Sequence, residues 1–160
     1  MKITHKLILP IILIGIVVTT DQLSKAYVIE LLRPLTYREI VVLPFLNIVY
    51  LWNGGISFGM FGWFKHSNYI FLVMSLFVSG FVTYLLFQTK NKLELVSYSL
   101  IVGGAVGNII DRIRYGKVFD FIYLHINQYY WPAFNVADSA ISIGAVIFVL
   151  TMFCKKGNDV

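Results

Sequence analysis

The chain has 160 residues, of which 58% are hydrophobic and only 13% are charged, and its mean hydropathy is +0.77. Soluble domains carry about 25% charged residues, so this composition excludes a soluble enzyme and indicates an integral membrane protein. Each helical crossing uses about 20 apolar residues, which leaves room for a single domain that covers residues 1–160.

Four apolar stretches are long enough to cross a membrane as helices, and they predict a mainly α-helical membrane fold. They cover about residues 7–28, 69–87, 95–111 and 136–153. The first stretch has to continue past Asp21 to reach membrane length. Lys2 and Lys6 before it would also suit a secretory signal, but no small-residue cleavage pattern follows, so the sequence predicts an uncleaved anchor.

The basic residues predict the orientation of these spans. The two tails and the short turn between the second and third spans have the highest density of lysine, with Lys2, Lys6, Lys90, Lys92, Lys155 and Lys156. The other basic residues are spread over two much longer connections. Dense positive charge marks the cytoplasmic side, so both termini are expected to be cytoplasmic.

The connection between the first two spans, residues 31–65, contains β-structure. Its segments 39–45 and 46–52 are rich in β-branched and aromatic residues and are bounded by proline and glycine. They predict a small extracytoplasmic β-sheet. Exposed aromatic residues such as Tyr50 and Trp52 suit the headgroup layer, so the sheet is expected to rest on the bilayer.

Two aspartates stand among apolar neighbours at the predicted outer membrane boundary, in a chain with only eight acidic residues. Asp120 lies between Phe119 and Phe121 and is expected to be desolvated and protonated. Asp138 opens the fourth span and is expected to be the better buried of the two. Carboxylates are costly there, and two that meet can share a proton and hydrolyse amides with one acid and one base.

The alternative is structural: each aspartate caps a helix or pairs with Arg112 or Arg114. A similar choice exists for Asp21 and Lys25, which lie four residues apart on one helix face, at ion-pair distance. They are interpreted either as a structural pair at a helix end, with Lys25 extended outward to the interface, or as part of a site.

The third span ends in small and then polar residues. Gly103 and Gly107 lie four residues apart and predict close approach of another helix. Asn108, Asp111 and Arg112 follow on a polar edge that can hold Asp120 or Asp138 by hydrogen bonds. By contrast, no metal site is predicted, because Cys154 is the single cysteine and the three histidines, His5, His66 and His125, lack ligand spacing.

Five motifs in series resemble those of the bacterial lipoprotein signal peptidases, also called signal peptidase II. They are Asp21 to Lys25, Asn53 to Phe58, Gly103 to Arg112, Val118 to Phe121, and Phe134 to Asp138. Their order, their spacing and the four spans cover nearly the whole chain. One position departs from the family pattern, because Ser57 stands where alanine is expected before Phe58.

The resemblance implies an intramembrane aspartic endopeptidase with Asp120 and Asp138 as catalytic residues and without cofactor or metal. The enzyme is expected to remove the signal peptide from diacylglyceryl-modified prolipoproteins by cutting before the lipidated cysteine. Other matching positions are expected to shape the site or bind substrate: Asp21, Lys25, Asn53, Asn108, Asp111, Arg112, Asn135 and Ala137.

The resemblance also implies the surroundings of the protein. The expected partners are lipidated prolipoproteins and membrane lipid, and not nucleic acid. The sequence leaves the oligomeric state open, and a monomer is the expectation. The expected location is the bacterial cytoplasmic (inner) membrane, with the active site near the extracytoplasmic face.

Two other classes place acids at a membrane face. A metal-dependent lipid headgroup transferase would cluster carboxylates on successive helix turns around a divalent ion, and no two acids have that spacing here. An ion-coupled carrier, or a nonenzymatic scaffold, is equally compatible with intramembrane acids. A carrier needs a polar path through both leaflets, whereas the second span has no charge.

Overall fold

The structure is a computed structural model that describes residues 3–36, 38–55 and 67–156. Four helices are long and apolar enough to cross a membrane, which confirms the predicted class. They are α1 (Ile3–Leu32), α2 (Ser67–Gln88), α3 (Lys92–Tyr115) and α4 (Val136–Lys156). Ser57 and His66 lie outside the described residues.

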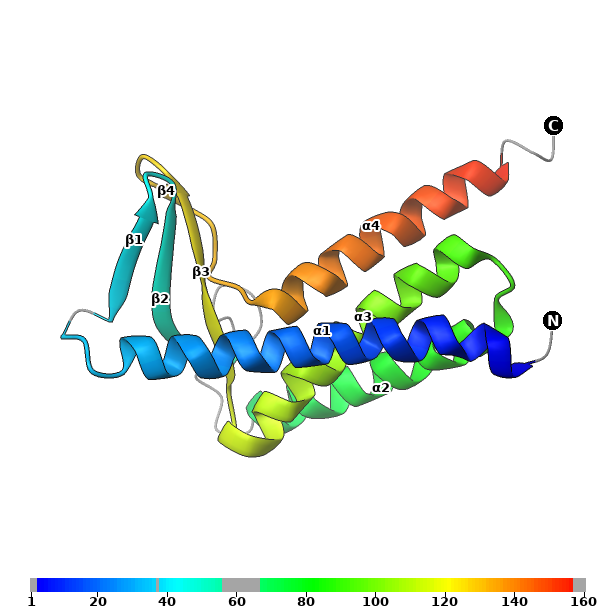
Figure 1. Cartoon of the computed structure of the whole chain (residues 1–160), viewed down its shortest axis with the longest axis horizontal. Coiled ribbons are helices and arrows are strands. Elements are labelled where there is room, and N and C mark those ends of the chain that lie inside the picture. Colours follow the sequence, from blue (N-terminus) through cyan, green and yellow to red (C-terminus); the bar gives the residue numbers. More distant parts are fainter. Residues whose placement is uncertain (1–2, 37, 56–66, 157–160) are drawn as a thin grey trace.

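Helix α3 is the centre of the bundle, and α1, α2 and α4 all pack against it. Its most apolar window is 67% buried, against 22% or less for the other three helices. The start of α1, the turn between α2 and α3, and the end of α4 lie at one end of the bundle, and the β-sheet lies at the other (Figure 1). Asn108 and Asp111, on the part of α3 near the sheet, are accordingly buried.

Glycines permit the close packing around α3. A Cβ atom added to Gly103 would lie 2.9 Å from the Cβ of Val17 on α1, and one added to Gly107 would lie 2.7 Å from Oδ2 of Asp21. Small residues at such contacts let two helix backbones approach. The predicted small-residue face of this helix is confirmed, and it faces α1.

The sheet is antiparallel, with the strand order β1, β2, β3, β4. Strands β1 (Glu39–Leu43) and β2 (Leu46–Asn53) form the predicted sheet between α1 and α2. Strands β3 (Val118–Ile126) and β4 (Tyr129–Tyr130) were not predicted. They come from the connection between α3 and α4, where Gly116 ends α3 with a left-handed φ of 70° and lets the chain turn into β3.

Phe119 on β3 anchors the sheet to α1. Its side chain is fully buried beside Val28 and Leu32, and its ring centroid lies 5.1 Å from those of both Tyr50 and Trp52. The expectation that Tyr50 and Trp52 are exposed in the headgroup layer is wrong, because both rings are half-buried against Phe119. The exposed apolar side chains of the sheet and its loops include Val41, Phe45, Tyr129 and Trp131.

Candidate active site

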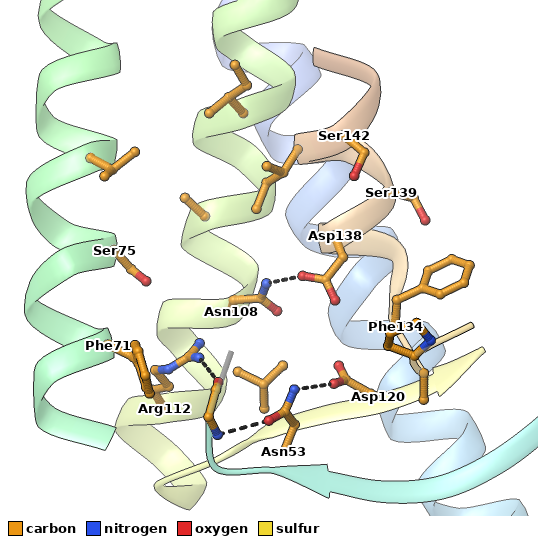
Figure 2. A pocket seen from close by; sticks show the side chains of 18 of the residues that line it. Asn53, Phe71, Ser75, Asn108, Arg112, Asp120, Phe134, Asp138, Ser139 and Ser142 are labelled. Carbon is orange, nitrogen blue, oxygen red and sulfur yellow. Dashed lines mark hydrogen bonds between the residues drawn. The ribbon is translucent and has the colours of Figure 1, made fainter. Parts of the chain in front are cut away.

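A cavity of about 740 Å³ lies between α2 and α4, over α3 from Ile101 to Arg112, and residues of β2 and β3 line one end of it. Asp120 comes from β3 and Asp138 from α4, and both line this cavity (Figure 2). The sequence therefore predicted correctly that the two aspartates meet. The apolar part of the lining includes Val78, Ile101 and Ile141.

Asp120 is only 2% exposed and is held by two amides. Its Oδ2 accepts a hydrogen bond from Nδ2 of Asn53 at 2.9 Å, and its Oδ1 accepts one from Nδ2 of Asn135 at 2.7 Å. Burial and the neighbouring Asp138 raise the pKa of Asp120 to about 7, against the opposing effect of these hydrogen bonds and of Lys25. Asp120 can therefore hold or release a proton near neutral pH.

Asp138 lies in the first turn of α4, as expected. Its Oδ1 accepts a hydrogen bond from Nδ2 of Asn108 at 2.7 Å. Its Oδ2 accepts the backbone N–H of Asn135 at 3.3 Å, while the backbone N–H of Asp138 donates to Oδ1 of Asn135 at 2.8 Å. This reciprocal arrangement is a capping box. Capping a helix and facing the cavity are thus compatible roles for one carboxylate.

By solvent exposure Asp120, and not Asp138 as expected, is the more enclosed aspartate. Asp138 is half-buried because its open side borders the cavity, whereas Asp120 is almost completely enclosed between the sheet and Asn135. Within the described residues, neither aspartate forms an ion pair with Arg112 or Arg114. The guanidinium of Arg112 instead donates to the carbonyl oxygen of Gly55 at 3.1 Å.

Asn135 links Asp120 to Asn108, the residue that donates to Asp138. Its Nδ2 lies 2.7 Å from Oδ1 of Asp120 and 3.2 Å from Oδ1 of Asn108, whose own Nδ2 donates to Asp138. Asn135 is fully buried, so these amide positions are fixed by packing as well as by hydrogen bonds.

Behind the cavity lies a buried cluster of Lys25, Asp21 and Asp111, here called the Lys25 cluster. Nζ of Lys25 lies 2.8 Å from Oδ2 of Asp21 and 2.8 Å from Oδ2 of Asp111. The expected ion pair with Asp21 is confirmed. The expected helix end is wrong because α1 continues to Leu32, and the expected outward extension is wrong because Lys25 is 3% exposed. The cause is Asp111, a second acid on α3 that draws the ammonium inward.

The Lys25 cluster also fixes the amide of Asn108. The third donor of the ammonium points to Oδ1 of Asn108 at 3.2 Å. Lysine has no acceptor, so the oxygen of Asn108 must face Lys25 and its Nδ2 must face Asp138. The orientation of the donor on Asp138 is therefore set by a charge on a different helix.

Asp21 and Asp111 also hold backbone groups next to the two aspartates. Oδ1 of Asp21 accepts the N–H of Ala137 at 2.9 Å, and Oδ2 of Asp111 accepts the N–H of Phe119 at 3.2 Å. Ala137 and Phe119 immediately precede Asp138 and Asp120 and are fully buried. Ala137, one of the predicted site positions, thus contributes its backbone and its small size.

The predicted site residues fall into two groups. Those that line the cavity are Asn53, Asn108, Arg112, Asp120 and Asp138. Those that lie behind it are Asp21, Lys25, Asp111, Asn135 and Ala137. Gln22 was not among the predicted residues, although its Nε2 donates to both Asp21 and Asp111. Its position directly after Asp21 in the first motif was the available signal.

Among the described residues, no group of three or more His, Cys, Asp or Glu side chains is placed to hold a metal ion. His125 lies on β3, where its ring packs 5.3 Å from that of Tyr130.

A sequence profile of the signal peptidase (SPase) II family matches residues 13–154. The chain belongs to this family. A lipoprotein signal peptidase of Anaplasma phagocytophilum is 41% identical to it over 96% of this chain and 97% of that relative. The one of Thermodesulfovibrio yellowstonii is 49% identical over 85% of this chain and 88% of that relative.

The fold agrees with the signal peptidase II assignment. A solved bacterial membrane enzyme, determined by the in meso method, superimposes with a TM-score of 0.81 and 30% identity and covers 94% of this chain and 91% of its own. The predicted family is confirmed, and the chain is a peptidase.

Proposed function

We propose that this chain is an intramembrane aspartic endopeptidase of one domain, residues 1–160. It removes the signal peptide from diacylglyceryl-modified prolipoproteins by cutting on the N-terminal side of the lipidated cysteine. The observation that carries the proposal is the meeting of Asp120 and Asp138 at one cavity between membrane-spanning helices. The names of the lipoprotein signal peptidases that resemble this chain support the choice of substrate.

The two aspartates would divide the work of acid and base. Asp120, with its pKa near 7, carries the shared proton, and Asp138, at the positive end of the α4 dipole, is the carboxylate. Asp138 takes a proton from water as the water oxygen bonds to the peptide carbonyl carbon, and Asp120 gives its proton to the carbonyl oxygen. Asp138 then protonates the leaving nitrogen, Asp120 recovers a proton from a hydroxyl of the intermediate, and the carbon–nitrogen bond breaks.

The position of the cavity fits a lipidated substrate. Such a substrate partitions into the bilayer, and a cavity between α2 and α4 can receive its peptide from the membrane while its acyl chains stay in lipid. The apolar lining of Val78, Ile101 and Ile141 suits the apolar residues of a signal peptide. Nδ2 of Asn53 donates to Asp120, and Nδ2 of Asn108 donates to Asp138. These hydrogen bonds can hold the two carboxyl groups in place during the reaction.

The same proposal includes the orientation. The chain would lie in the bacterial inner membrane as a monomer with both termini cytoplasmic. The start of α1 with Lys6, the turn with Lys90 and Lys92, and the end of α4 lie at the end of the bundle away from the sheet, and dense positive charge marks the cytoplasmic side (Figure 1). The sheet and the cavity would then be at the extracytoplasmic face.

The test is cleavage of a lipidated precursor by the purified protein in detergent, in the presence of a metal chelator, with mass spectrometry of the products. We expect a product that begins with the lipidated cysteine, and no cleavage of the matched precursor in which that cysteine is replaced by serine. Cleavage that disappears with the chelator would contradict the metal-free aspartic mechanism. Absence of cleavage by the folded protein would contradict the proposed substrate.

A further inference from the structure

Gln22 sits between the two buried acids of the Lys25 cluster. Its Nε2 lies 3.0 Å from Oδ1 of Asp111, 3.2 Å from Oδ2 of Asp21, and 3.2 Å from the carbonyl oxygen of Gly107. Ionised carboxylates only accept hydrogen bonds, so the amide must present its nitrogen and not its oxygen to them. Gln22 is thus a second bridge between Asp21 and Asp111, beside Lys25.

The bridge is needed because the charges of the cluster do not balance. Asp21 and Asp111 carry two negative charges when ionised, and the ammonium of Lys25 supplies one positive charge. Two like charges in a buried site repel more strongly than in water. The dipole of the Gln22 amide points its positive end at both carboxylates and so reduces this repulsion.

The distance between Asp21 and Asp111 affects the distance between the proposed catalytic residues, Asp120 and Asp138. Asp21 holds the backbone N–H that precedes Asp138, and Asp111 holds the backbone N–H that precedes Asp120. Asp120 and Asp138 enter the cavity from β3 and α4, which are separate elements (Figure 2). The two bridges therefore tie together the backbones from which the two aspartates project.

We propose that Gln22 is a positioning residue that sets the spacing between Asp120 and Asp138 through the carboxylates of Asp21 and Asp111. The inference rests on the proposed aspartic peptidase function. Gln22 does not line the cavity, so it acts on the reaction without contacting substrate.

Loss of the Gln22 bridge between Asp21 and Asp111 should change the titration of Asp120 and Asp138. A residue that only stabilises the fold would not change this titration. If Asp21 and Asp111 move apart, Asp120 and Asp138 also separate. The electrostatic coupling between the carboxyl groups of Asp120 and Asp138 then weakens. Coupled carboxylates titrate in two steps whose separation grows with their interaction. The pH interval between the two titration steps of Asp120 and Asp138 should therefore narrow. The cleavage rate should also fall, because positioning errors of about 1 Å can lower the rate about 100-fold.

The variant Gln22→Met keeps the length of the side chain and removes both donors. The matched control is Leu23→Met at the adjacent position on α1, where the side chain is 65% exposed. We expect Gln22→Met to lower the single-turnover rate on a lipidated peptide by about 10- to 100-fold at unchanged KM, and to narrow the pH–rate bell. We expect Leu23→Met to match the wild type. Gln22→Leu replaces Gln22→Met if the latter does not fold.

A second measurement needs no substrate and separates this inference from the proposed function. Infrared titration of the aspartate carboxyls, assigned with Asp120→Asn and Asp138→Asn, gives the two titration steps directly. A narrower interval in Gln22→Met supports positioning even if the wild type cleaves no lipoprotein. An unchanged interval and an unchanged rate per folded molecule, with only a lower melting temperature, would overturn the inference.

Discussion

At the scale of single residues, the two aspartates are chemically identical and differ in their surroundings. Asp120 is enclosed and accepts hydrogen bonds from Asn53 and Asn135, whereas Asp138 is half-buried and belongs to a helix cap. Different surroundings separate the protonation of otherwise equal acids, which is what a reaction with one acid and one base requires.

The first prediction concerns the pH dependence of cleavage. The active state has one proton on the pair, so the rate should be bell-shaped. Because the pKa of Asp120 is raised from 3.8 to about 7, the active state should persist to near neutral pH and decline above it as Asp120 loses its proton. Single-turnover cleavage, with folding checked at each pH, measures this profile. A rate that continues to rise into strongly alkaline conditions would contradict the shared-proton mechanism.

A second prediction concerns stability. In the unfolded chain Asp120 ionises near pH 4, but in the folded chain it ionises near pH 7, so folding stability falls as the pH rises between these values. At about 1.4 kcal/mol per pKa unit, the loss is on the order of 4 kcal/mol. Asp120→Asn removes the ionisation but turns an NH2 group toward Asn53 or Asn135, so the comparison is the change of melting temperature with pH. The melting temperature of Asp120→Asn should fall less between pH 4 and pH 8 than that of the wild type. An equal fall in both proteins would show that the buried carboxylate carries no such cost.

The third prediction concerns Lys25. Removal of its ammonium leaves two buried carboxylates without their counter-charge, which typically costs about 3–5 kcal/mol. Lys25→Ala should therefore lower the melting temperature in detergent and leave substrate binding nearly unchanged, since Lys25 is behind the cavity. Leu23→Ala on the exposed face of α1 is the control. Weakened binding at unchanged stability would move Lys25 into the binding site.

At the scale of elements, the helices were predictable and half of the sheet was not. A membrane span is recognised in a sequence by its length and its apolar composition, so all four helices were predicted. Helices α1 and α3 extend about one turn beyond the predicted ends. Strand β3 was not predicted, because the residues around Asp120 were interpreted only as its apolar surroundings. In addition, β3 pairs with β2, from which it is separated in the sequence by α2 and α3. Local patterns cannot reveal such a pairing.

The packing of α3 against α4 yields the fourth prediction. A Cβ atom added to Gly104 would overlap the carbonyl oxygen of Ala137 and lie 2.7 Å from Cγ1 of Ile141. The first contact is backbone, so the start of α4, and Asp138 with it, must move. Gly104→Ala should lower both stability and the cleavage rate. Gly15→Ala, where nothing lies within 4 Å of the added Cβ, should leave both unchanged. Wild-type activity in Gly104→Ala would mean that the position of α4 is not critical.

At the scale of the whole molecule, the site is assembled from all four helices and the sheet. The sequence could identify the predicted site residues but not which of them line the cavity. The resemblance of the motifs pointed to Asp21, Lys25 and Asn135 without separating residues at the cavity from residues behind it. The inward position of Lys25 depended on Asp111, an acid far away in the sequence. Contacts of that kind follow from the fold and not from spacing.

The most direct test of the account is single-turnover cleavage of a lipidated precursor by Asp120→Asn and Asp138→Asn, each purified and shown to be folded. Asparagine keeps the shape of aspartate and one acceptor oxygen, replaces the other oxygen by an NH2 group, and removes the proton that the reaction transfers. The account predicts that each variant loses cleavage while it keeps the fold and substrate binding. Substantial turnover by either folded variant would contradict the assignment of Asp120 and Asp138 as the catalytic pair.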